Sequence, residues 1–209
     1  MTARLGILTA GPFGEAVAGA CRSHEPQALV VPLQDALAAP PRATAEIAFA
    51  LVATWRRHPA AIETLDGRFW RIGLPWSEVT LEGPLLRAGP LVVPGSSSCY
   101  GCFRTRWLSN SPTSDRELAL DSCFDRDAAI GIHGFTPSLV RIAAALALCD
   151  RRDGAVAAGR VRWFDVRTGS LFEERVVRIH GCRRCGGDRR PGERYWRQLR
   201  DVVLAPGRG

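Results

Sequence analysis

The residues best suited to chemistry in this sequence are four cysteines in two C-x-x-C pairs, Cys99 with Cys102 and Cys182 with Cys185. A C-x-x-C turn directs two thiolates at one centre, and two such turns complete a tetrahedral site of four sulfurs, which suits Zn²⁺. Because the protein fills all four positions, such a site would be structural and not catalytic. The long separation between the pairs predicts a metal ion that joins distant parts of one fold.

The cysteine pattern leaves alternatives open. The pairs could be unrelated and reduced, or they could form a disulfide within the chain, although no thioredoxin-like context surrounds either pair. His180 lies just before Cys182 and is an alternative ligand, but we expect it to be a bystander or to cap the turn. The other cysteines are predicted to be buried free thiols: Cys21, Cys123 and Cys149.

A glycine turn follows the first apolar segment of the chain. The order of an apolar strand at residues 5–8, a turn and a helix is typical of the β–α–β opening of a Rossmann-like sheet. The turn contains Gly11 and Gly14 but lacks G-x-G-x-x-G, and Pro12 has no backbone N–H to donate to a phosphate. Only Asp35 could serve as the acidic residue that binds a ribose. We therefore predict a degenerate Rossmann-like scaffold that has lost its nucleotide, with binding at this turn left open.

The remaining pattern extends this opening into an α/β domain. The expected strands and hairpin segments lie within residues 5–8, 28–32, 45–53, 71–80, 85–94, 161–166 and 171–179. The expected helices begin at residue 15 or cover residues 55–65, 103–108 and 137–149. The last helix is apolar almost all round and is expected to be buried. A linker is expected at Pro40–Pro41, and the C-terminal hairpin leads directly into the second cysteine pair.

The positive charge of the chain comes from arginine alone. The formal net charge is +7, and the sequence contains no lysine, so all 28 basic residues are arginine. This excludes a Walker lysine, a Schiff-base lysine and a lysine general base within this chain, because arginine does not deprotonate near neutral pH. The basic balance favours an acidic partner, either nucleic acid or an acidic peptide, although genome composition also explains part of the arginine excess.

Arginines gather around both cysteine pairs and in the C-terminal region. They are Arg104, Arg106, Arg183, Arg184, Arg189, Arg190, Arg194, Arg197 and Arg200, with Tyr195 and Trp196 among them. Such a set could bind phosphates and stack on bases, so an arginine-rich nucleic-acid-binding zinc protein is one alternative function.

Adenylation of a peptide carboxylate is a second alternative, and it requires charged groups around the ATP phosphates and Mg²⁺. The candidates are Arg56, Arg57, Asp66 and Arg68, although we favour a solvated helix face for them. A hydrolase is not favoured, because serines 96–98 lack a G-x-S-x-G elbow and the histidines are scattered. Among the histidines, His133 between two glycines is the strongest functional candidate.

The cysteine pairs and the segments around them resemble a known family. Leu91–Gly95 leads to the first pair, and the second pair follows a buried helix and a hairpin that contains Asp165–Gly169. This layout is similar to the cyclodehydratase partner proteins of thiazole/oxazole-modified peptide biosynthesis, including bacteriocins, over about residues 4 to 186. Those proteins are E1-like, of the ThiF type. The resemblance implies a Rossmann-like sheet and a structural zinc held by the four paired cysteines.

The resemblance also implies a function. E1-like proteins of this kind present a precursor peptide and stimulate a YcaO-type enzyme, which uses ATP and Mg²⁺ to convert Cys, Ser or Thr residues into azolines. The expected role is a non-catalytic cytoplasmic scaffold, in a homodimer or hetero-complex, with neither a membrane nor nucleic acid as an expected partner. We expect one E1-like domain over residues 1–187, without a peptide-clamp or YcaO domain, and an Arg/Gly-rich tail over residues 188–209.

Overall fold

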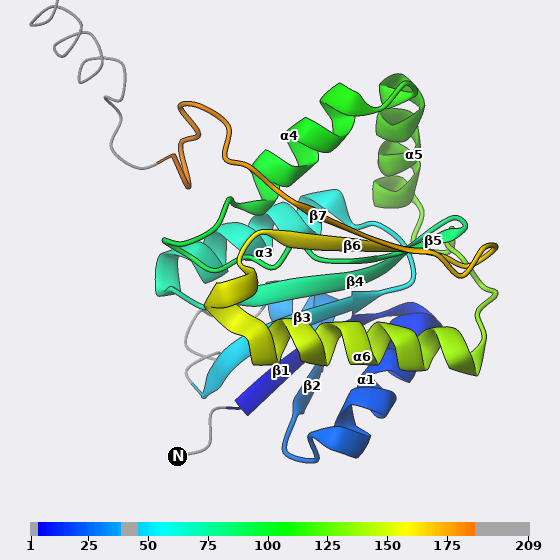
Figure 1. The fold of residues 1–209 in the computed structure, drawn as a ribbon. Helices are drawn as coiled ribbons and strands as arrows, with labels where there is room; N and C mark the ends of the chain where they lie inside the picture. Colours follow the sequence, from blue (N-terminus) through cyan, green and yellow to red (C-terminus); the bar gives the residue numbers. More distant parts are fainter. Residues whose placement is uncertain (1–3, 39–45, 187–209) are drawn as a thin grey trace, which may run out of the picture.

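A single mixed sheet forms the centre of the protein, in a computed structural model that describes residues 4–38 and 46–186. Its strands are β1 (Arg4–Ala10), β2 (Leu29–Pro32), β3 (Ile47–Thr54), β4 (Trp76–Glu82), β5 (Leu85–Ala88), β6 (Arg160–Asp165) and β7 (Leu171–Arg175). Their order across the sheet is β2-β1-β3-β4-β5-β6-β7 (Figure 1). Strands β2, β1, β3 and β4 are parallel, whereas β5, β6 and β7 follow as antiparallel neighbours. The parallel half and the C-terminal hairpin confirm the predicted α/β organisation.

Helices cover both faces of this sheet (Figure 1). They are α1 (Gly11–His24), α2 (Leu33–Ala38), α3 (Pro59–Ile72), α4 (Tyr100–Asn110), α5 (Ser114–Arg126) and α6 (Pro137–Asp153), and a short 3-10 turn (Gly154–Ala157) follows. On one face, α1 and α6 pack into a core that includes Val17 and Ala143. On the other face, α3 and α4 contribute Ile62 and Phe103 to a second core.

The central strands are buried because their sequences favour burial on both faces. Strand β3 reads IAFALVAT, and its last six residues are buried, as expected for a strand covered on two sides. Polar side chains in the same region are paired. Thr54 donates to Thr80 at 2.8 Å, and Ser77 donates to the buried carboxylate of Asp150 at 2.6 Å. Pairing of this kind offsets the cost of removing hydroxyl groups from water.

Four helices differ from the prediction in their bounds or exposure. Helix α4 spans Tyr100–Asn110 where residues 103–108 were expected. Helix α1 begins at Gly11, earlier than expected, because Pro12 suits the first helical turn, where its missing N–H breaks no helical hydrogen bond. Helix α3 continues to Ile72 and ends where Gly73 adopts left-handed backbone. Helix α6 was predicted to be buried all round, but Arg141 and Ala145 lie on an exposed side.

Three further elements correct the prediction. The short helix α2 (Leu33–Ala38) was not predicted. Helix α5 was not predicted, because Asp121 is its one buried residue and it lacks the apolar stripe by which a helix is recognised. Strand β7 ends at Arg175 and does not continue to residue 179. The predicted linker at residues 40–41 and the predicted tail over residues 188–209 lie outside the described residues. Within residues 4–38 and 46–186, no helix has both the length and the apolar character that crossing a membrane requires.

Candidate functional site

The four paired cysteines come together in space. The Sγ atoms of Cys99 and Cys182 are 3.6 Å apart, and those of Cys102 and Cys185 are 3.3 Å apart. All four sulfurs lie within 4.8 Å of one another, and three of the four side chains are buried. Tetrahedral bonds of about 2.3 Å would place the sulfurs about 3.8 Å from one another. The four donors therefore fit one metal ion, and sulfur donors in this geometry suit Zn²⁺.

Local backbone structure directs both pairs at this centre. Cys99 is the N-cap of α4, and Cys102 lies in the first turn of that helix. Cys182 and Cys185 belong to a turn that follows β7, in which the Gly186 N–H donates to the Cys182 carbonyl at 3.0 Å. A side chain at Gly186 would meet the same carbonyl at 2.4 Å, so this close turn requires glycine.

The surroundings shift the pKa values of these thiols in different directions. Burial raises the pKa of Cys185 to about 11 and raises that of Cys99 further. Burial opposes ionisation of Cys182 as well, but the backbone N–H groups of Cys185 and Arg184 outweigh it and lower the Cys182 pKa to about 7. Since metals bind thiolates and not thiols, a bound cation would favour the deprotonated form of all four.

A buried carboxylate connects the two cysteine segments. Asp66 of α3 is fully buried and accepts hydrogen bonds from Trp76 Nε1 and from the Tyr100 backbone N–H, both at 3.2 Å. Arg184, between the second pair of cysteines, donates to the same carboxylate and to Glu63 at 2.7 Å. Burial raises the pKa of Asp66, and the Arg184 guanidinium opposes that effect. This contact holds the second cysteine turn against α3 and the start of α4.

Two arginines fasten the segment between β7 and the second pair of cysteines. Arg106 of α4 donates to the carbonyls of Val177 at 2.6 Å and Arg178 at 3.0 Å. Arg178 in turn donates to the carbonyls of Ser97 at 3.1 Å and Gly95 at 2.9 Å, just before the first pair. These contacts do not involve a metal, so the protein itself brings the two segments close together.

The arginines considered for nucleic-acid binding are largely engaged within the protein. Arg106 and Arg184 make the contacts above, and Arg104 forms an ion pair with Asp121 at 3.1 Å. Arg183 is exposed. The other members of the set lie outside the described residues: Arg189, Arg190, Arg194, Arg197 and Arg200, with Tyr195 and Trp196. The described part therefore offers less free arginine surface than the sequence suggested.

The glycine turn at the start of α1 is covered by a tryptophan. Gly11 has φ +71, and a Cβ atom there would lie 2.3 Å from Trp55 Cγ. A Cβ atom at Gly14 would lie 2.2 Å from the Ala53 carbonyl oxygen, so this glycine allows α1 to pack closely on β3. Trp55 is only 8% exposed, and its ring occupies the space above the first turn of α1. In nucleotide-binding folds of this type, phosphates lie at that helix N-terminus.

The two histidines singled out from the sequence lie outside the cysteine cluster. His133 is exposed and packs edge-on against the Trp55 ring, with centroids 4.7 Å apart. His180 is exposed, and the group of possible metal ligands consists of the four cysteines. Of the remaining thiols, Cys21 is buried as predicted. Cys123 and Cys149 are only partly buried, which corrects the prediction.

The expectation of a solvated helix face at the four adenylation candidates is wrong. Arg56 is 4% exposed and lies over the Phe124 ring, and Asp66 is fully buried. Arg68 donates to the Ala36 carbonyl at 3.1 Å. The Nε and Nη1 atoms of Arg56 are buried without a hydrogen-bond partner among the described residues. The contacts of these residues lie in different parts of the fold, so they do not form one ATP site.

Arg57, the fourth candidate, belongs to a buried ionic network that the sequence did not reveal. It pairs with Glu117 at 2.7 Å and Asp121 at 2.9 Å, and lies 3.6 Å from Glu82. Glu82 also accepts from Arg87 at 2.6 Å. The network connects α5 to the hairpin of β4 and β5, which explains how a mostly polar helix is held on the domain.

Comparison with known proteins gives matches among solved structures, whereas no family model and no curated protein matches. The heterocyclase TruD is 19% identical, over 88% of this chain and 27% of that chain, with a TM-score of 0.58. E. coli MccB is 15% identical, over 88% and 67%, with a TM-score of 0.58, and is also known with AMPCPP and MccA. The E. coli microcin synthetase McbBCD complex contains a chain 14% identical, over 86% and 67%, with a TM-score of 0.59.

These similarities concern the fold. The chain spans 27% of the length of TruD, and the identities are below 20% throughout. The predicted fold is confirmed: the chain has a MccB/ThiF-like α/β fold with a mixed seven-stranded sheet, and four clustered cysteines in it could hold a metal ion.

Proposed function

We propose that this chain is a zinc-stabilised, E1-like scaffold subunit of a peptide-modifying complex. It presents a ribosomally made precursor peptide and stimulates a YcaO-type, ATP-dependent cyclodehydratase that forms azolines from Cys, Ser or Thr. The supporting observation is a fold shared over 88% of the chain with the heterocyclase TruD, together with the cysteine cluster. The similar chain in the McbBCD complex supports a role inside an assembly. Such a subunit contributes proximity and orientation.

In this proposal Cys99, Cys102, Cys182 and Cys185 hold one Zn²⁺ in a closed, structural site. The metal supplies a cross-link between α4 and the turn that follows β7. Structural zinc sites of small peptides are worth on the order of 10–16 kcal/mol at neutral pH, which exceeds the entropy cost of closing a long loop. The Asp66–Arg184 contact joins the second cysteine turn to α3 through protein groups alone.

A role without adenylation is supported by the glycine turn. The Trp55 ring lies where the phosphates of a nucleotide would approach α1, and Pro12 removes one donor from that turn. The chain has no lysine to bind phosphate. These features differ from what a nucleotide-consuming enzyme requires, so ATP and Mg²⁺ are assigned to the YcaO-type partner.

Co-purification tests the proposal. A candidate YcaO-type enzyme and a candidate short precursor peptide are expressed together with the tagged chain, which is then isolated. The proposal predicts that both are retained by the zinc-loaded chain. Retention of neither partner, with the chain folded and metal-loaded, would contradict it.

An adenylating enzyme is the second candidate, and one observation favours it. Arg56 is buried with two nitrogen atoms unpartnered in the described part of the chain, just beyond the carboxyl end of β3. Such a group could bind an anion. Pyrophosphate exchange with the isolated chain and each candidate peptide separates the two functions. Exchange above background would favour adenylation, and its absence with every peptide would favour the scaffold.

A further inference from the structure

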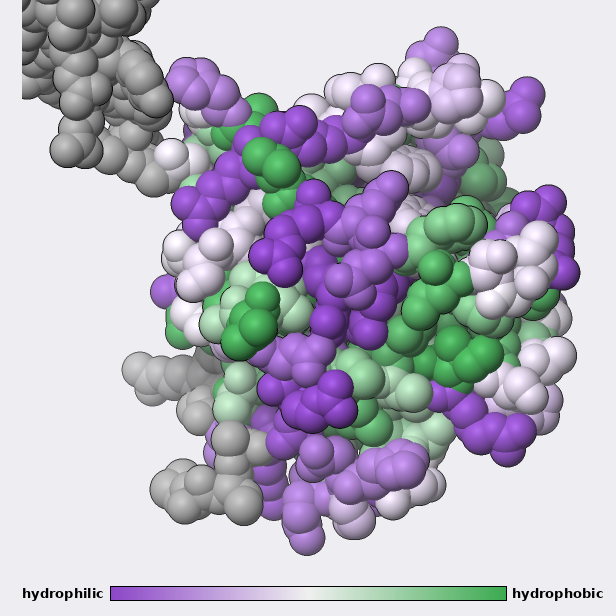
Figure 2. Space-filling model, in the orientation of Figure 1, coloured by the Kyte–Doolittle hydropathy of each residue, from purple (hydrophilic) through white to green (hydrophobic). Residues whose placement is uncertain are grey.

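Strand β7 forms a free edge of the sheet. In the part of the chain that the structure describes, β7 pairs only with β6, and all five of its residues are exposed. The Val176 N–H donates to the Gly159 carbonyl at 2.8 Å. In the antiparallel register, every second residue before Val176 therefore also forms its backbone hydrogen bonds with β6. Leu171, Glu173 and Arg175 therefore direct their backbone N–H and C=O groups away from β6. Figure 2 shows hydrophilic side chains gathered over β6 and β7. An unpaired edge of this kind is a template for an added strand.

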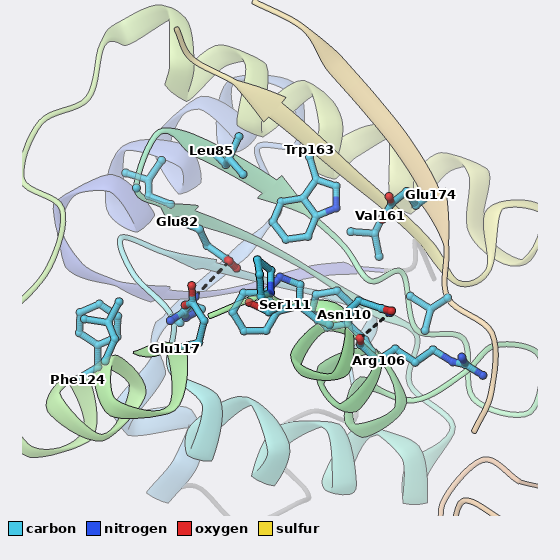
Figure 3. A pocket seen from close by; sticks show the side chains of 18 of the residues that line it. Glu82, Leu85, Arg106, Asn110, Ser111, Glu117, Phe124, Val161, Trp163 and Glu174 are labelled. Atoms are coloured by element: carbon cyan, nitrogen blue, oxygen red, sulfur yellow. Dashed lines mark hydrogen bonds and ion pairs between the residues drawn. The ribbon is translucent and has the colours of Figure 1, made fainter. Parts of the chain in front are cut away.

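A cavity of about 810 Å³ lies beside this edge, between the sheet and the pair of helices α4 and α5. In Figure 3, Trp163 of β6 points into it opposite Ser111 at the end of α4. Phe103 and Trp107 add aromatic walls. Glu174 of β7 is part of the lining, so the cavity reaches the edge strand. The register places Phe172 opposite Trp163 and Glu174 opposite Val161, so both β7 side chains lie on the cavity face.

The charges around the cavity favour a cationic occupant over an anionic one. Arg57 lines the cavity but is already surrounded by Glu82, Glu117 and Asp121. A further anion would meet those carboxylates. Glu174 makes no side-chain hydrogen bond or ion pair with any other described residue, and it lies at the mouth. Arg106 and Arg175 also line the cavity, which makes the formal charge of its lining balanced. The Arg106 guanidinium is engaged by backbone carbonyls, and the Arg175 side chain lies on the other face of β7 because side chains alternate along a strand. Glu174 is therefore the charge of β7 that faces an incoming side chain from the cavity side.

The geometry points to a peptide-binding site at β7, and we propose that an extended peptide segment adds there as an eighth strand. Its cavity face carries a basic side chain beside Glu174 and an apolar side chain beside Phe172, two residues apart, because same-face positions in a strand alternate. Phe172 is 56% exposed and offers the apolar contact. This inference rests on the proposed function, in which the segment belongs to the precursor peptide.

The test measures binding of short labelled peptides to the full metal-loaded chain by fluorescence anisotropy. One peptide carries arginine and valine at alternating cavity-face positions, with threonine between them. A second peptide has glutamate in place of arginine. Glu174→Arg is expected to weaken binding of the arginine peptide about tenfold and to strengthen binding of the glutamate peptide, because a cross-strand attraction becomes a repulsion. The matched control is Glu173→Arg on the opposite face of the same strand, with an expected change below about threefold.

Backbone N-methylation of the peptide distinguishes strand addition from side-chain contact alone. Methylation at peptide residues whose N–H faces β7 is expected to abolish binding. Methylation at the alternate residues, whose N–H faces away from β7, is expected to leave binding unchanged. The proposal is overturned if both methylated peptides bind equally or if Glu173→Arg and Glu174→Arg have equal effects. It is also overturned if no peptide binds because a second copy occupies the edge, seen as a dimer that Glu173→Pro dissociates.

The same variants separate this inference from the proposed function. If Glu174→Arg leaves stimulation of the cyclodehydratase unchanged while neither peptide binds wild-type chain, the β7 site is wrong and the scaffold function stands. If the peptides bind as predicted but the chain stimulates no cyclodehydratase, the β7 site stands and the scaffold function is wrong.

Discussion

The cysteine cluster and the glycine turn are both places where a fold of this type can hold a non-protein group, and they differ in what occupies the centre. Four sulfurs lie within 4.8 Å of one another, and they form the group of possible metal ligands found among the described residues. At Gly11, by contrast, the Trp55 ring lies against the first turn of α1 and occupies the space there. In the proposed function the chain keeps the arrangement that joins distant segments, and Trp55 closes the one that would bind phosphates. A scaffold needs the first property and not the second.

The largest expected effect comes from breaking the cysteine cluster. Cys102→Ala removes one of four ligands and is expected to abolish stoichiometric metal binding and to lower the free energy of unfolding by about 4 kcal/mol or more. Elemental analysis and thermal unfolding measure both quantities. Cys123→Ala is the control, because Cys123 is partly buried on α5 and outside the cluster. Equal metal content and stability in the two variants would contradict the assignment.

Opening the glycine turn is expected to have the next largest effect. Trp55→Ala removes a buried aromatic side chain and is expected to lower the free energy of unfolding by about 3–4 kcal/mol in a urea titration. The variant also tests whether Trp55 alone prevents nucleotide binding at the glycine turn. If it binds ATP in a calorimetric titration and the wild type does not, the tryptophan alone closes the site. ATP binding by the wild-type chain would show that the turn is not closed.

Loss of the Asp66 carboxylate, which holds the second cysteine turn against α3, is expected to lower the free energy of unfolding by a smaller amount. Asp66→Ala leaves Trp76 Nε1 and the Tyr100 N–H without their acceptor and leaves Arg184 paired with Glu63 only, and is expected to cost about 3 kcal/mol. Glu63→Ala removes the more exposed partner of Arg184 and is expected to cost less than about 1 kcal/mol. Chemical denaturation of both variants checks the difference. Similar losses in the two would mean that Asp66 is not the main anchor.

The smallest effect is a pH dependence from His58, the N-cap residue of α3. Burial, with a contribution from Arg56, lowers the pKa of His58 from 6.5 to about 4. The unfolded chain therefore binds more protons than the folded chain between these pH values, and stability falls as the pH falls through this window. We expect a loss of roughly 2 kcal/mol between pH 7 and pH 5 from this residue. His58→Gln should reduce the slope of unfolding free energy against pH, and an unchanged slope would contradict the account.

The sequence predicted the features that depend on local patterns. Spacing indicated that the two cysteine pairs share one centre, and the mostly apolar run at residues 45–53 indicated a strand. Gly11 and Gly14 correctly indicated close backbone packing, but they lie in α1 and not in a turn before it, because the helix begins at Gly11. In each case the prediction rests on a conformational or burial preference that belongs to the residue type itself.

The sequence did not reveal contacts between residues far apart. Asp66 and Arg184 are 118 positions apart, and each looked like a candidate for another function. The cover over Gly11 comes from Trp55, which follows a different strand. Helix α5 is held by the ion pairs of Arg57 with Glu117 and Asp121, which no periodicity encodes. These features depend on which elements meet in the folded chain.

Titration of this chain into a reconstituted reaction tests the central claim most directly. The mixture contains the YcaO-type enzyme, ATP, Mg²⁺ and the precursor peptide, and mass spectrometry follows the loss of one water per azoline. The account predicts that the rate rises with the concentration of the zinc-loaded chain and then saturates. A rate that is the same without the chain as with a saturating amount would contradict it.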